Sequence, residues 1–63
     1  MKTHIVTVRL MLRNGIWKQV RQYETNNADF NVHVALNQRY LKKVGQVLDV
    51  KLHKFTEEEL SNG

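Results

Sequence analysis

Residues 6–25, VTVRLMLRNGIWKQVRQYET, decide the fold of this chain, because two strand-like runs flank a turn signal at Asn14-Gly15. In the first run, apolar residues at positions 6, 8, 10 and 12 alternate with residues 7, 9, 11 and 13, as in a strand with one buried face. Asn-Gly favours a tight turn because both residues tolerate positive φ. The second run, from Ile16 to Thr25, is rich in strand-forming residues. The stretch predicts a β-hairpin in which Leu10 is buried.

The pairing of the two strands remains open between two registers. A two-residue turn pairs Leu12 with Trp17 and directs Trp17 and Tyr23 into the core. A three-residue turn with a glycine bulge pairs Leu12 with Ile16 and directs both aromatic residues outward. A slip of one residue exchanges the two faces of the whole second strand. We favour the second register slightly, because it places Ile16 and Val20 together in the core.

The next segment has the capping residues and apolar spacing of a helix. Thr, Asn and Asp side chains at positions 25–29 can accept hydrogen bonds from free N–H groups at a helix start, and Asp29 suits the positive end of the helix dipole. Apolar residues then recur at helical spacing, at Ala28, Val32, Ala35, Leu36, Tyr40 and Val44. We expect one helix over residues 28–44, packed on the sheet by Val32, Leu36 and Tyr40.

A strand is the alternative for the first half of this segment, since positions 30, 32, 34 and 36 also alternate as apolar residues. The caps and the two alanines favour the helix. Lys42 and Lys43 would lie in its last turn with Gly45 as the C-cap, and Arg39 joins them in a small basic cluster that complements the helix dipole.

A third strand follows, with Leu48, Val50 and Leu52 alternating with polar residues over residues 47–55. A right-handed crossover from the second strand places the third beside the first. We therefore expect an α+β fold of ββαβ order: a three-stranded antiparallel sheet of order 2-1-3 with one helix on one face. Residues 1–56 would form a single domain. Residues 57–63 would be an acidic tail that frays, although Thr56 and Glu59 have capping-box spacing.

Composition restricts the possible classes of function. The chain has a formal net charge of +4, and residues 1–56 carry all ten Lys and Arg against only Glu24, Asp29 and Asp49. A basic body of this kind suits an anionic partner, nucleic acid first. The chain has no cysteine, no apolar run long enough to span a bilayer, and a beginning without the apolar core of a signal peptide. We expect a cytoplasmic protein with no membrane partner.

The residues give no sign of catalysis. No thiol nucleophile is present, and the three glycines are isolated, whereas phosphate-binding loops need clustered glycines. His33 and Asn37 stand four residues apart, as a structural polar pair on a helix does. Asp49, Lys51 and His53 line one face of the last strand, which a solvated sheet face explains. We expect a protein that is not an enzyme and has no cofactor or metal site.

The best candidate for a binding site is the set of basic and aromatic side chains on the hairpin. In the three-residue-turn register these side chains share the open face of the sheet. Arginine and aromatic residues together contact phosphates and stack on bases, and they also dominate hot spots between proteins. The predicted site consists of Arg9, Met11, Arg13, Trp17, Gln19, Arg21 and Tyr23.

The layout resembles two groups of phage proteins. A turn at Asn14-Gly15, residues 23–25 (YET) leading into a helix, and residues 47–50 (VLDV) closing the sheet are similar to compact ββαβ bacteriophage proteins, among them an inhibitor of bacterial RNA polymerase. Residues 14–18 (NGIWK) and the arginine-bearing strands resemble the three-stranded-sheet DNA-binding domains of phage integrases, in which the open sheet face enters the major groove.

These resemblances imply a phage or prophage accessory protein. Its partner would be nucleic acid or a nucleic-acid-processing protein. The alternative is an inhibitor or adaptor that binds a host protein.

Overall fold

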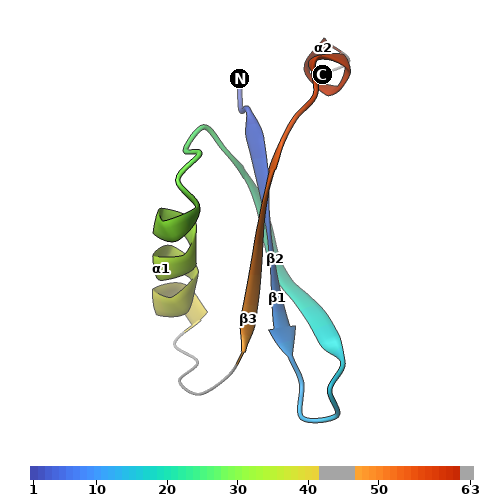
Figure 1. Ribbon diagram of the computed structural model, residues 1–63, viewed down its shortest axis with the longest axis vertical. Coiled ribbons are helices and arrows are strands. Elements are labelled where there is room, and N and C mark those ends of the chain that lie inside the picture. Colours follow the sequence, from blue (N-terminus) through green and yellow to red (C-terminus); the bar gives the residue numbers. More distant parts are fainter. Residues whose placement is uncertain (42–46, 62–63) are drawn as a thin grey trace.

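The computed structural model describes residues 1–41 and 47–61, and it confirms the predicted ββαβ order. Strands β1 (His4–Met11) and β2 (Trp17–Thr25) form the hairpin, helix α1 (Phe30–Leu41) follows, and strand β3 (Leu48–Lys54) completes the sheet before a short helix, α2 (Glu57–Ser61) (Figure 1). The sheet has the order β2-β1-β3, and both pairings are antiparallel. The α+β class and the sheet order are therefore as predicted.

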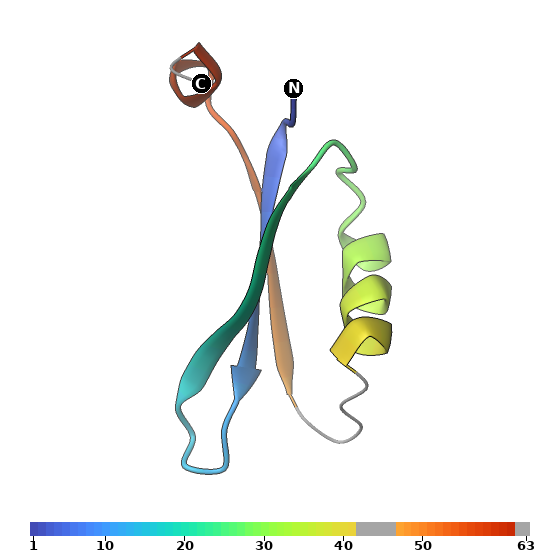
Figure 2. The same ribbon diagram turned by 180° about the vertical axis from the view of Figure 1, so that it is seen from behind.

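Helix α1 lies on one face of the sheet in both views of the molecule (Figures 1 and 2). On that face, Val6 and Val8 of the central strand are fully buried, and Leu10 and Val50 are nearly so. The burial of Leu10 confirms its predicted place. We call this face the covered face. None of the described elements covers the opposite face, which we call the uncovered face.

The hairpin closes with a three-residue loop, as the favoured register predicted. The Leu12 N–H donates to the Ile16 carbonyl at 2.9 Å, and Gly15 takes a positive φ of 82° in the loop between them. However, Ile16 is 59% exposed and Leu12 is also exposed, so the expectation that they belong to the core is wrong. The turn extends past the end of α1, so no helix or strand of the described residues packs over these two side chains (Figure 1).

A β-bulge then changes the register within the hairpin. Arg9 of β1 pairs with Gln19 of β2, but Val8, the residue before Arg9, pairs with Arg21. Val20 is therefore left as an extra residue on β2. Val20 packs against the core, as expected. Beyond the bulge the pairing is the one that a two-residue turn would have produced. Each of the two registers considered from the sequence therefore holds for part of the hairpin.

The capping residues before α1 act as predicted. The Asp29 carboxylate accepts hydrogen bonds from the backbone N–H groups of Asn31 at 3.0 Å and Val32 at 3.4 Å. Asn27 in turn accepts one from the N–H of Asp29. The helix begins at Phe30 rather than Ala28, and the alternative of a strand over this segment is wrong. The predicted last turn and C-cap (Lys42, Lys43, Val44 and Gly45) lie outside the described residues.

The face of α1 that packs on the sheet differs from the predicted one. The buried residues of the helix are His33 and Asn37, while Val34 and Leu41 pack against the core. The residues expected to pack inward are exposed: Val32 by 38%, Leu36 by 49% and Tyr40 by 64%, and Ala28 and Ala35 are also exposed. The helix is therefore rotated about its axis, with a polar pair in the interface and an apolar row outside.

Helix α2 begins with the capping box that the sequence indicated. The Thr56 N–H donates to the Glu59 carboxylate at 2.9 Å, and the Glu59 N–H donates to the Thr56 hydroxyl at 3.1 Å. The acidic segment therefore forms at least one helical turn, which lies at the opposite end of the molecule from the hairpin turn (Figure 1).

Candidate functional site

The structure divides the predicted hairpin site between different surfaces. Four of its residues share the uncovered face, because Met11 pairs with Trp17 and Arg9 pairs with Gln19 before the bulge. Arg13 lies in the hairpin turn, exposed and outside the sheet.

Arg21 and Tyr23 point to the covered face, which corrects the prediction that they share a surface with Trp17. The cause is the extra residue at Val20, which reverses the faces of the rest of β2. Tyr23 pairs with the buried Val6, and its hydroxyl reaches α1. The single predicted site is thus two groups of side chains on opposite faces.

On the uncovered face, the charge of Arg9 is already offset. Its Nε and Nη2 donate to Oδ2 of Asp49 at 2.9 Å and 2.7 Å, and its guanidinium lies 5.2 Å from the centre of the Trp17 ring. The strand pairing places Lys51 and Glu24 on the same face. Positive and negative side chains therefore balance there, which does not favour an anionic partner.

Under α1, a buried polar network joins the helix to β2. The Tyr23 hydroxyl lies 2.8 Å from Nδ1 of His33, and Asn37 Nδ2 donates to that hydroxyl at 3.1 Å. Nε2 of His33 lies 2.7 Å from the Asn27 carbonyl. Because a carbonyl oxygen can only accept, Nε2 carries the proton, and in this tautomer Nδ1 accepts from the Tyr23 hydroxyl. The network explains why two polar residues can be buried here: their hydrogen bonds are satisfied.

This network also holds Arg21 in place. Its Nη1 donates to the side-chain carbonyl of Asn37 at 3.1 Å. Its guanidinium lies 4.6 Å from the centre of the Tyr23 ring and 4.0 Å from that of Tyr40. Both distances are within the range of a cation–π interaction. A half-buried arginine thus contacts two tyrosine rings, one from β2 and one from α1.

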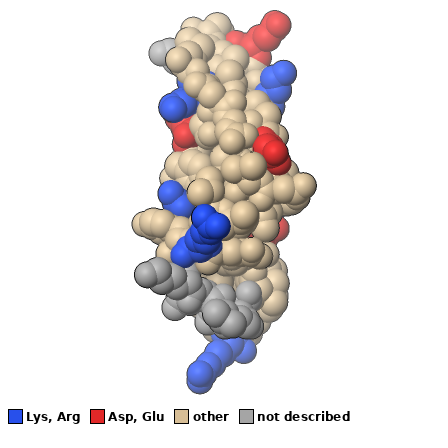
Figure 3. All heavy atoms as spheres, turned by 90° about the vertical axis from the view of Figure 1, so that its left-hand side faces the viewer, with Lys and Arg blue, Asp and Glu red and all other residues tan. Residues whose placement is uncertain are grey.

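These side chains line a groove of about 330 Å³ between β2 and α1, formed by Arg21, Tyr23, Leu36, Arg39 and Tyr40. We call it the β2–α1 groove. All six acidic residues of the chain are described, and none of them lines it. On the side of the molecule where α1 lies, basic side chains project at several points, and the acidic atoms visible lie in the upper half and along one edge (Figure 3). The groove therefore combines positive charge, aromatic rings and an exposed apolar side chain.

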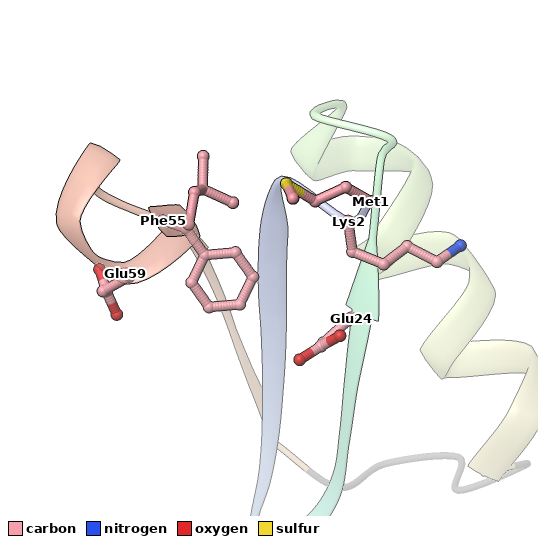
Figure 4. Close-up of a pocket in the computed structure, with 6 residues that line it drawn as sticks. Met1, Lys2, Glu24, Phe55 and Glu59 are labelled. Carbon is pink, nitrogen blue, oxygen red and sulfur yellow. The ribbon is translucent and has the colours of Figure 1, made fainter. Parts of the chain in front are cut away.

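A second hollow, of about 580 Å³, lies at the other end of the molecule, where the chain start meets α2. Figure 4 shows the Phe55 ring and the Met1 side chain beside it, with Glu24 below and the Lys2 ammonium directed away from Phe55. Glu59 also lines it but is engaged by the capping box. Its charged groups do not converge on one point, so it is a weaker candidate than the groove.

Three groove residues were not among the predicted site residues. Leu36 and Tyr40 were assigned to the core, and Arg39 to the helix dipole. The available signal was the spacing of His33, Val34, Asn37 and Leu41, which also fits one helix face. Choosing that face would have placed Leu36 and Tyr40 at the surface.

Residues 1–41 and 47–61 offer neither a cluster of metal ligands nor a helix that could span a membrane. This part of the chain contains no group of three His, Cys, Asp or Glu side chains placed to hold a metal ion. Within the same ranges, neither helix has the length and apolar character that crossing a bilayer requires. No family model, curated protein or solved structure matches this chain.

Proposed function

We propose that this chain is a non-enzymatic protein that binds nucleic acid through the β2–α1 groove. The observation that carries the proposal is the lining of the groove, in which two arginines and two tyrosines meet without a carboxylate. Arginines supply hydrogen bonds and charge to phosphates, and tyrosine rings offer faces for bases. The surface expected from the sequence, the uncovered face, is less suitable, because Asp49 offsets Arg9 there.

The positions of the acids support this choice of surface. Asp29 caps α1, Asp49 pairs with Arg9, and Glu24 lies on the uncovered face. The three remaining acids lie in α2. Phosphate binding is mainly electrostatic, so a polyanion approaches the surface that carries the fewest negative groups.

Contact with a host protein is the second candidate function. The observation that favours it is the apolar row on α1, where Val32 and Leu36, one helical turn apart, are 38% and 49% exposed. Exposed apolar residues grouped on one helix can form the centre of a protein interface. The proposal places either partner in the cytoplasm and assigns the chain to the phage accessory proteins that its ββαβ layout resembles.

The test is a salt titration of a fluorescent oligonucleotide with the parent protein and two charge-matched variants. Arg39→Gln removes one positive charge from the groove, and Lys51→Gln removes one from the uncovered face. We expect Arg39→Gln to weaken binding and to reduce the slope of log affinity against log salt by about one unit at most. Lys51→Gln should leave both values nearly unchanged.

Two results would reject the proposal. If the parent shows no saturable binding even at low salt, nucleic acid is not the partner, and the host-protein function takes its place. If the two variants weaken binding equally, the attraction is a property of the whole basic chain and the groove is not the site.

A further inference from the structure

The ring of Tyr40 has one occupied face and one open face. The Arg21 guanidinium lies 4.0 Å from the ring centre on the first. Tyr40 is nevertheless 64% exposed. A ring with a guanidinium on one side can be so exposed only if its other side is open to solvent. Tyr40 therefore presents a flat aromatic surface at the edge of the groove.

Contacts with buried residues fix the position of this aromatic surface. Asn37 is 0% exposed and is fixed by its hydrogen bonds to the Tyr23 hydroxyl and to the His33 carbonyl, the latter 2.7 Å long. Asn37 holds Arg21, whose guanidinium lies over the rings of both Tyr23 and Tyr40. The guanidinium and the two rings thus form a cation–π stack. Because the stack exists before a ligand arrives, a ligand that extends it avoids most of the cost of ordering side chains.

We propose that the ligand is single-stranded nucleic acid, with an unpaired base stacked on the open face of Tyr40 and a neighbouring phosphate at Arg39. This inference rests on the proposed function and specifies its ligand. Bases within a duplex are already stacked on both sides, whereas an unpaired base can add to the exposed ring. Arg39 lines the same groove one residue before Tyr40, and the half-exposed Leu36 adds an apolar contact.

The experiment compares a fluorescent single strand with a duplex of the same sequence, using the full chain and measuring anisotropy at fixed low salt. The single strand should bind more tightly. Tyr40→Ala should weaken single-strand binding by about 5- to 150-fold, the usual range for a lost base–aromatic stack. Tyr40→Phe keeps the ring and should stay close to the parent. The salt slope should not change in either variant, because neither removes a charge.

Gln38→Ala serves as the matched control, since Gln38 is exposed on the same helix but does not line the groove. Far-UV circular dichroism of each variant checks that α1 is retained. The inference is overturned if Tyr40→Ala binds like the parent, or if the duplex binds as tightly as the single strand. If Arg39→Gln still weakens binding in that case, nucleic-acid binding through the groove stands without the stacked base. If no nucleic acid binds, both proposals fail.

Discussion

Replacing Tyr23 with Phe removes one hydroxyl from the buried network and leaves the ring in place. That hydroxyl donates to Nδ1 of His33 at 2.8 Å and accepts from Nδ2 of Asn37 at 3.1 Å. Asn37 keeps its bond to the His33 carbonyl, but Nδ1 of His33, which is only 2% exposed, loses its partner. The change therefore leaves two buried groups unsatisfied, the Nδ1 acceptor of His33 and one of the two N–H donors of Asn37 Nδ2.

An unsatisfied buried polar group costs about 1–3 kcal/mol. A chain of 63 residues has a total stability of roughly 3–9 kcal/mol at the usual value per residue. Tyr23→Phe should therefore remove a large share of the free energy of unfolding. The assay is urea denaturation, followed by the fluorescence of Trp17, with comparison of midpoints and slopes.

Tyr40→Phe is the matched control, because it also removes one tyrosine hydroxyl, but from a residue that is 64% exposed. Its free energy of unfolding should stay within about 0.5 kcal/mol of the parent. If Tyr23→Phe is as stable as Tyr40→Phe, the hydroxyl does not hold the network together, and the account of why His33 and Asn37 are buried is wrong.

Three further predictions concern the sheet, the turn and α2. Leu10 is 6% exposed, so Leu10→Ala should cost about 2–5 kcal/mol in unfolding free energy, and a melting temperature equal to that of the parent would contradict its place in the core. Gly15→Ala should cost roughly 1–2 kcal/mol for the positive φ of 82° alone, since a Cβ there meets nothing within 4 Å; an unchanged urea midpoint would refute this. The backbone N–H of Thr56, with smaller contributions from its side chain and from His53, lowers the pKa of Glu59 below 4.5. The support that Glu59 gives to α2 is therefore complete above that value and is lost as the pH falls through the lower folded pKa; a Thr56 amide shift that titrates at 4.5 or above would contradict it.

The sheet was predictable because its signals are local. Alternation along residues 6–12 and 48–52 marked the buried face, Asn14-Gly15 marked the turn, and the handedness of crossovers set the order. The bulge was not predictable, because residues 18–22 (KQVRQ) contain one apolar residue and no glycine to mark where the register changes. The face of Arg21 depends on that one inserted residue.

The orientation of α1 could not be predicted from its own residues. His33 and Asn37 are buried because Tyr23 and Arg21 supply their hydrogen-bond partners from 10 to 16 residues earlier in the chain. Those partners reach the helix only after the bulge turns them toward it. Periodicity alone favoured the more apolar row that contains Val32. The combination of arginine and aromatic residues at the candidate site was expected, but the groove that gathers them depends on these long-range contacts.

Mapping the binding surface by nuclear magnetic resonance tests most directly whether nucleic acid binds in the groove. Isotope-labelled protein is titrated with an unlabelled single-stranded oligonucleotide at low salt, and the shift of each backbone amide is followed. We expect the largest changes at the residues of the β2–α1 groove, with little change on the uncovered face around Arg9, Trp17 and Lys51. Changes centred on the uncovered face, or no changes at all, would rule out the groove as the binding site.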